Sequence, residues 1–187
     1  MAPKGTTQRL SDGDPVDFTD AKQAWADAAR PVLERVAGTY NLYIEYKDLA
    51  ESVQQDTGIT TGVLVHHWIG SVLGAVARDR RAPDEPMLSS LCVRTDGTVG
   101  SDYGEAVLER EGAVPADLDL HAAEERLACY RYFGADLPPD GGKPMLTRQL
   151  RAKRSRVVRQ PERAPRRQCP TCFIEVAASG VCGICGE

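Results

Sequence analysis

Apolar residues recur at steps of three and four along much of this chain, a spacing typical of amphipathic helices. The first such segment begins at Thr19 or Asp20 and ends near Gly38, and Pro31 is expected to kink it or split it. The second, residues 62–81, ends on three arginines and is followed by prolines. The two apolar faces contain Ala24, Trp25, Ala28, Val32, Leu33 and Val36, and Val65, Trp68, Ile69, Val72, Leu73 and Val76.

Shorter elements lie between and after these helices. Alternation over residues 40–46 predicts a short strand that leads into a helix over residues 47–55. Residues 87–94 and 98–103 flank a Thr-Asp-Gly turn and predict a β-hairpin. A last helix should run from a capping aspartate, Asp117 or Asp119, to Phe133.

Helix, short strand, helix, helix and hairpin is the order of a winged helix-turn-helix domain. The expected fold class is therefore α+β and mainly helical, with the third helix able to enter a DNA major groove and the hairpin as the wing. We predict a disordered N-terminus at residues 1–15, a winged-helix-like domain at 16–136, a basic Arg/Pro-rich linker at 137–167 and a small zinc ribbon at 168–187.

Composition limits the class of protein. Of the 187 residues, 42% are hydrophobic, which is enough for a core. No run of eighteen apolar residues and no secretory signal occurs, so we expect a soluble, cytoplasmic protein without a membrane partner.

The charges are segregated along the chain. Residues 1–142 carry 13 Lys or Arg and 24 Asp or Glu, a net charge of −11, whereas residues 143–167 carry 10 basic residues and a single glutamate. Such a basic segment suits the phosphate backbone of nucleic acid. It could instead be a solvated tether, or could fold back on the acidic domain. Within it, residues 146–158 could form a transient helix.

Four cysteines near the C-terminus form two Cys-x-x-Cys pairs, separated by nine residues. Cys169, Cys172, Cys182 and Cys185 supply the closed tetrahedral thiolate shell that a structural Zn²⁺ prefers. A disulfide framework would need an oxidising compartment, and a thioredoxin-like motif has only one such pair, between a strand and a helix. We therefore predict a zinc ribbon with a structural role. Cys92 and Cys129 lie far from it and are expected to be ordinary buried residues.

Three short motifs resemble the DNA-binding domain of the alkylguanine-DNA alkyltransferases and alkyltransferase-like proteins. Glu45-Tyr46-Lys47-Asp48-Leu49-Ala50 resembles that family's "TYxxLA" motif, Ile69-Gly70-Ser71-Val72-Leu73-Gly74 its "VGxALG" helix, and Val93-Arg94-Thr95-Asp96-Gly97-Thr98-Val99-Gly100 its "VVxxDGxxGGY". The match covers roughly residues 40–104. The resemblance implies a duplex-binding scaffold in which Tyr46, Lys47 and the helix from Gly62 approach the DNA backbone.

The family's reactive cysteine, in "PCHRV", falls at Ser89, and no Pro-Cys-His sequence is present. A serine hydroxyl cannot replace a thiolate activated by histidine. Cys92 lies three residues later and, on an alternating strand, would face the side opposite Ser89. We therefore do not expect alkyl transfer.

No other catalytic motif occurs, so we expect a protein that is not an enzyme. Adjacent His66 and His67 do not face each other on a helix and cannot share one metal ion, and His121 lies beside Glu124 and Glu125 without a matching partner motif. An enzyme acting on DNA through Ser89, His66 or His121 is the weakest hypothesis.

The leading hypothesis is a DNA-associated protein that binds duplex nucleic acid through the winged helix and the Arg-rich linker. The alternative is an adaptor that docks on a nucleic-acid-processing machine through its acidic domain and the apolar ribbon, which lacks Lys and Arg between its cysteine pairs. The candidate nucleic-acid contacts are Tyr46, Lys47, His66, His67, Arg78, Arg80, Arg81, Arg94, Arg148, Arg151, Lys153, Arg154, Arg156 and Arg159.

Overall fold

A computed structural model describes residues 6–159, 168–169, 171–175 and 182–185 of this chain. The chain divides into two units, residues 1–151 and 152–187. The described part is mixed α and β, with about half of the chain in helices. The six α-helices found there are α1 (Phe18–Ala37), α2 (Tyr46–Thr57), α3 (Ile69–Arg78), α4 (Ser101–Glu111), α5 (Leu118–Tyr132) and α6 (Arg148–Arg159).

The strands are short and form two separate pairs. β1 (Thr7–Arg9) pairs antiparallel with β3 (Ile59–Thr61), with Thr7 opposite Thr61. β2 (Ile44–Glu45) pairs in parallel with β4 (Cys92–Val93), with Ile44 opposite Cys92. Two 3₁₀ helices, η1 (Val65–His67) and η2 (Leu88–Leu91), precede α3 and β4.

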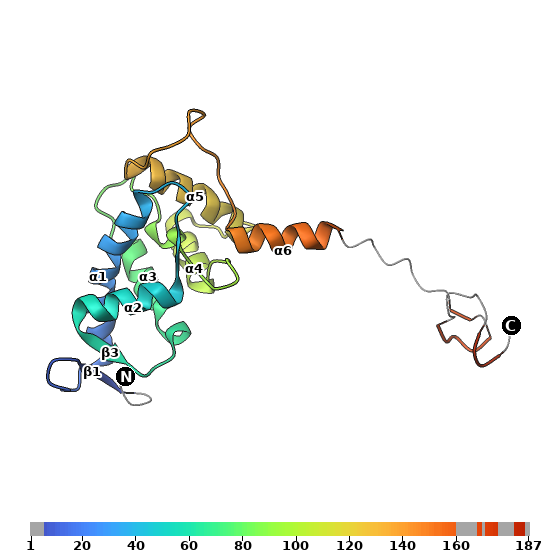
Figure 1. The fold of residues 1–187 in the computed structure, drawn as a ribbon, viewed down its shortest axis with the longest axis horizontal. Coiled ribbons are helices and arrows are strands. Elements are labelled where there is room, and N and C mark those ends of the chain that lie inside the picture. The colour runs from blue at the N-terminus through green and yellow to red at the C-terminus, as the bar shows by residue number, and fades with distance from the viewer. Residues whose placement is uncertain (1–5, 160–167, 170, 176–181, 186–187) are drawn as a thin grey trace. The chain divides into compact units, whose positions relative to one another are not determined.

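The main core forms around α1, which packs against both α2 and α3 (Figure 1). The buried rings of Trp25 on α1 and Trp68 before α3 lie 4.3 Å apart between centroids. Each indole N–H donates to a backbone carbonyl, Trp25 to Ile59 at 3.1 Å and Trp68 to Val63 at 3.3 Å. The two largest core side chains are therefore buried without an unsatisfied donor.

Helix α1 confirms the first predicted segment but is continuous through Pro31, so the predicted split is wrong. Asp17 caps its N-terminus by accepting hydrogen bonds from the backbone N–H groups of Thr19 and Asp20. Pro31 is exposed, whereas both halves of the helix bury their apolar faces in the same core. That shared burial outweighs the single backbone hydrogen bond that proline removes.

Helix α5 also agrees with the sequence, because Asp117 caps it as expected. Helix α2 covers the predicted segment and adds a residue or two at each end. The long helix expected over residues 62–81 is shorter than predicted. Only Ile69–Arg78 is α-helical, and Val65–His67 forms the separate turn η1.

The predicted hairpin is wrong, and the winged-helix prediction is not confirmed. The N–H of Arg94 donates to the Thr98 carbonyl at 2.8 Å and closes a tight turn, but helix α4 then begins at Ser101 instead of a second strand. Its buried residues Tyr103, Ala106 and Val107 follow a helical period and pack on a second core cluster. β4 pairs with β2 in place of a wing.

Residues 7–9 contradict the expected disorder of residues 1–15, because they form β1. The Thr7 hydroxyl donates to the Thr61 hydroxyl at 3.0 Å, and the strand supplies partners for the backbone of β3. In the basic segment, the helix predicted over residues 146–158 is present as α6, Arg148–Arg159.

A buried ion cluster joins α1 to the loop after α3. Arg30 and Glu85 are each only 3% exposed, and one guanidinium nitrogen lies 2.6 Å from a Glu85 oxygen. Glu34 and Asp79 each lie 3.1 Å from the same guanidinium. Burial alone would raise the pKa of Glu85, but hydrogen bonds from Arg30 and from the Arg81 N–H outweigh it and hold that pKa below its usual value.

Replacing Arg30 with methionine should lower the free energy of unfolding by about 3–5 kcal/mol, because Glu85 would remain buried without its counter-charge. Urea denaturation measures the change. Arg35→Ala, at an exposed position of the same helix, should change stability by less than about 0.5 kcal/mol. A loss below about 1 kcal/mol for Arg30→Met would contradict a structural role for this pair.

Candidate metal centre and charged surfaces

The four predicted cysteine ligands converge on one point. The sulfur atoms of Cys169, Cys172, Cys182 and Cys185 all lie within 4.8 Å of one another, and those of Cys172 and Cys182 are 3.4 Å apart. A tetrahedral ion with bonds of about 2.3 Å to sulfur requires sulfurs about 3.8 Å apart. The cluster therefore fits a tetrahedral metal ion, as the spacing of the pairs predicted.

Backbone N–H groups in the two Cys-x-x-Cys turns point at the sulfurs. Hydrogen bonds from the N–H groups of Cys172 and Thr171 lower the pKa of Cys169 to about 6. The N–H groups of Cys185 and Ile184 likewise lower the pKa of Cys182. The neighbouring cysteine sulfurs act in the opposite direction on the other two ligands, raising the pKa of Cys172 and raising that of Cys185 to about 12. The turns therefore favour the metal-ligating thiolate form at Cys169 and Cys182.

The first turn is closed by its own backbone. The Phe173 N–H donates to the Cys169 carbonyl and the Cys169 N–H donates to the Ile174 carbonyl, both at 2.9 Å. Gln168 and Glu175 form an antiparallel bridge beside them. Phe173 adopts a left-handed backbone conformation with φ of 58°, and its side chain is 75% exposed. Ile174 and Ile184 are also exposed, so the cysteine turns present apolar side chains to solvent.

The candidate contacts at the start of α2 and in η1 do not form a basic surface. Tyr46 is mostly buried, and burial raises its pKa to about 12. Lys47 is exposed and lies 3.8 Å from Glu51, one turn along the helix. His66 and His67 are exposed, with ring centroids 4.1 Å apart.

Helix α3 is poorly placed to enter a DNA groove. It packs against α1 and α4, and only Ser71 and Arg78 along it are exposed. Arg78 lies 3.5 Å from Glu109, and Arg81 lies 3.4 Å from Glu34. Arg80 and Arg94 are exposed as well. The arginines after α3 are thus interspersed with carboxylates.

Basic residues of the predicted linker lie along α6. Arg148, Arg151, Lys153 and Arg156 are exposed and Arg154 is half-buried, while the side chain of Arg159 lies outside the described part. Arg163, Arg166 and Arg167 also lie outside the described residues. Among the residues with described side chains, no salt bridge involves Arg148, Arg151 or Arg156.

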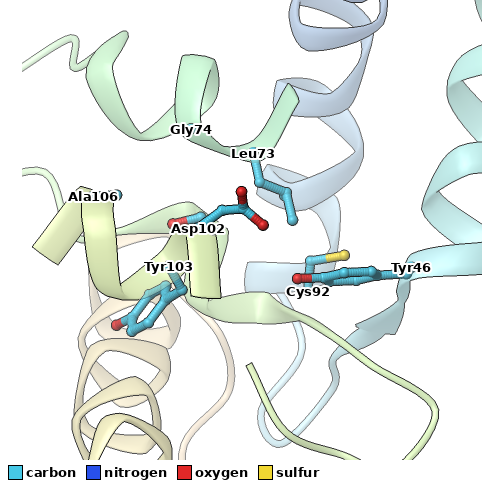
Figure 2. A pocket seen from close by; sticks show the side chains of 8 residues that line it. Tyr46, Leu73, Gly74, Cys92, Asp102, Tyr103 and Ala106 are labelled. Atoms are coloured by element: carbon cyan, nitrogen blue, oxygen red, sulfur yellow. The ribbon is translucent and has the colours of Figure 1, made fainter. Parts of the chain in front are cut away.

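Ser89, which the sequence resemblance aligned with the alkyltransferase cysteine, lines a small cavity of about 10 Å³, room for about one water molecule. Ser89 is 3% exposed, and its hydroxyl has no hydrogen-bond partner among the residues that the structure describes. Figure 2 shows the Asp102 carboxylate pointing into the space between Leu73, Cys92 and Tyr46. A Cβ atom at Gly70 would collide with that carboxylate, so a larger residue there would require Asp102 to move.

Cys92 lines the same cavity as Ser89, so the expectation that the two face opposite sides is wrong. Residues Leu88–Leu91 form a 3₁₀ helix instead of a strand, and side chains three residues apart eclipse in that helix. Burial raises the pKa of the Cys92 thiol far above neutrality. Such a thiol is a weak nucleophile, and the cavity contains no histidine to activate it.

A second group with ligand-type side chains contains Glu111, His121 and Glu125, whose ligand atoms lie within 4.8 Å of one another. Both imidazole nitrogens already have partners, the Tyr103 hydroxyl at 2.9 Å and Glu111 at 3.1 Å. Glu125 accepts the Met87 N–H at 2.7 Å. The sequence analysis named both Glu124 and Glu125 beside His121, and of these two the structure brings Glu125, one helical turn on, into the group. Internal hydrogen bonds account for this cluster.

No family model matches the chain, and neither a curated protein nor a solved structure matches it significantly. The alkyltransferase resemblance therefore stays a prediction. Among the described residues, no helix combines the length and the apolar character needed to cross a bilayer.

The full chain should bind one equivalent of Co²⁺ per molecule with the absorption of a tetrahedral tetrathiolate, because four sulfurs already converge. Cys185→Ala should remove that spectrum. Cys92→Ala, which deletes a buried thiol that is not part of the cluster, should retain it. An unchanged spectrum in Cys185→Ala would rule out the four-sulfur site.

Proposed function

We propose that this chain is a non-enzymatic nucleic-acid-binding protein that attracts duplex DNA through α6 and carries a structural Zn²⁺ at the four cysteines. The observation behind the proposal is the row of exposed basic side chains on α6, where Arg148, Arg151 and Arg156 form no salt bridge within the described side chains. Unpaired cations on one helix can neutralise phosphates and release their counterions.

The contact is placed on α6 instead of the third helix of a winged helix. Helix α3 is covered by its neighbours, and Arg78 and Arg81 pair with carboxylates. Burial of α3 leaves little of it for a DNA groove. The resemblance to the alkyltransferase-like proteins supports an association with DNA but does not fix which surface carries it.

Zinc is the proposed ion because the donor set consists of four thiolates in two short turns. Tetrahedral S₄ sites favour zinc or iron, and a closed shell without an open position is typical of structural zinc. Cys169, Cys172, Cys182 and Cys185 would hold the ion. It would stabilise a segment too short to bury much apolar area by itself.

Charge reversal on α6 should weaken binding to a labelled DNA duplex. Lys153→Glu with Arg156→Glu should make the negative slope of log K against log salt shallower by roughly 2, because about two phosphate contacts are lost. Fluorescence anisotropy at several salt concentrations measures the slope.

The control for this experiment is Lys22→Glu with Arg35→Glu on α1, which changes the net charge equally and should leave the slope nearly unchanged. If both double variants lose affinity to the same degree, net charge and not α6 governs the binding. If the wild-type protein binds duplex without salt dependence, the proposal fails.

A protein adaptor is the second candidate, and the exposed side chains of Phe173, Ile174 and Ile184 favour it. Apolar side chains around a metal centre suit a protein surface better than a phosphate backbone. The pairing of Arg78 and Arg81 with carboxylates also fits a domain that does not bind DNA.

Under the adaptor hypothesis, a pull-down from nuclease-treated lysate should recover one partner in stoichiometric amount. Phe173→Ser with Ile184→Ser should abolish its recovery while metal binding persists, because neither residue is a ligand. The α6 variant Lys153→Glu with Arg156→Glu should still recover the partner. Recovery that depends on α6 and disappears after nuclease treatment would favour the nucleic-acid function instead.

A further inference from the structure

A cavity of about 220 Å³ lies at the junction of three parts of the first unit. Asn41 and Tyr43 line it from the segment after α1, Arg126 and Tyr130 from α5, and Arg148 and Arg151 from the start of α6. The cavity is far larger than one water molecule requires. Its lining holds three arginines and no carboxylate.

Arg126 is the buried member of this lining. It is 3% exposed, and its guanidinium donates to the backbone carbonyls of Ser90 at 3.0 Å and Met145 at 3.3 Å. No salt bridge among the described residues includes it. Burial lowers its pKa, so the charged form is held at a cost that neutral carbonyls offset only in part.

The two other arginines are exposed at the edge of the same cavity. Arg148 and Arg151 are three residues apart on α6 and therefore lie on one face of the helix. The N-terminus of α6 also lies at the cavity, since Arg148 is the first residue of that helix. The Thr147 hydroxyl caps this end by accepting the Leu150 N–H at 3.4 Å. The positive end of the helix dipole adds to the three guanidinium charges.

Tyrosine side chains form fixed walls of the cavity. The Tyr130 hydroxyl donates to the Leu42 carbonyl at 2.7 Å, and the Tyr43 hydroxyl donates to the Gln149 side chain at 2.7 Å. The Tyr43 oxygen also accepts the Arg148 N–H at 3.3 Å. These bonds hold the rings and the start of α6 in place before any ligand arrives.

We propose that this cavity binds the phosphate group of a phosphomonoester, with Arg126 at its base and Arg148 and Arg151 at its edge. Planar guanidinium groups bind phosphate oxygens in pairs of parallel hydrogen bonds, and three of them suit a dianion. A phosphodiester inside a duplex is flanked by two sugars, whereas a terminal phosphate can enter a concave site. Taken together with the proposed function, this makes the ligand a chain end of a polynucleotide or a free mononucleotide.

Anisotropy with the full-length, metal-loaded protein tests the proposal. The probes are single-stranded oligonucleotides with a 5′-phosphate, a 3′-phosphate or hydroxyls at both ends. A terminal phosphate should tighten binding at least about tenfold through the added charge-assisted hydrogen bonds. Arg148→Ala with Arg151→Ala should abolish this gain, whereas Arg35→Ala on α1 should retain it.

Competition with adenosine monophosphate and with inorganic phosphate identifies the source of the phosphate. If the mononucleotide displaces the phosphorylated probe at similar concentration, the site takes small phosphomonoesters. If the gain occurs with oligonucleotides alone, the site takes a chain end, and only that result rests on the proposed function. Arg126→Lys, which keeps the charge but loses the planar fork, should reduce the gain in either case.

Equal affinity for all three probes, with no displacement by the mononucleotide or by phosphate, would overturn the proposal. Salt-dependent duplex binding through α6 could persist in that case, so the two failures are distinguishable. Lys153→Glu with Arg156→Glu is the complementary variant. It should weaken the binding of all three probes and leave the ratio of their affinities unchanged.

Discussion

A guanidinium group removed from water has to be met by anions or by well-placed dipoles, and this requirement shapes the first unit of the protein. Two arginines, Arg30 and Arg126, are equally buried at 3% exposure. Three carboxylates surround Arg30, and they join α1 to the loop that follows α3. By contrast, the Arg126 guanidinium donates to two backbone carbonyls and has no carboxylate partner in the part of the chain that the structure describes.

The two arginines differ in whether the fold neutralises their charge. Carboxylates neutralise Arg30, whereas Arg126 keeps a charge that a ligand could neutralise. The attraction between Arg30 and Glu85 offsets the cost of removing both groups from water. The pair therefore holds the core together and presents no net charge to a ligand. Arg126 is not neutralised in this way, and its side chain lines a cavity that two exposed arginines also line. Charge that the fold leaves uncompensated at a concave surface is what a binding site for an anion requires.

The sequence predicted the elements whose signal is local. The apolar period of α1, the aspartate cap of α5 and the spacing of the cysteine pairs each depend on residues close together in the chain, and all three agree with the structure. The hairpin prediction failed because a turn at residues 94–98 does occur, but Tyr103, Ala106 and Val107 then continue with a helical period that an alternating pattern hides.

Long-range arrangements could not be predicted. The cavity combines Asn41, Arg126 and Arg148, and the first and last of these are more than a hundred residues apart in the chain. The sequence of α5 around Arg126 has the pattern of an ordinary helix. It does not show whether the guanidinium of Arg126 has a carboxylate partner in the folded protein. The shared cavity of Ser89 and Cys92 was missed for a related reason, since one 3₁₀ turn in place of a strand reverses the face on which a side chain lies.

Electrostatics also argues that the candidate metal centre does not take part in the proposed phosphate contacts. Four thiolates and one divalent ion sum to roughly −2, and residues 168–187 contain no Lys or Arg to offset that charge. A centre with this charge would repel phosphate at short range. Its exposed Phe173, Ile174 and Ile184 instead match the apolar character of protein surfaces that associate. If the chain contacts both a polyanion and a protein, the cationic start of α6 and the cysteine turns are therefore the respective places, and each can be altered without disturbing the other.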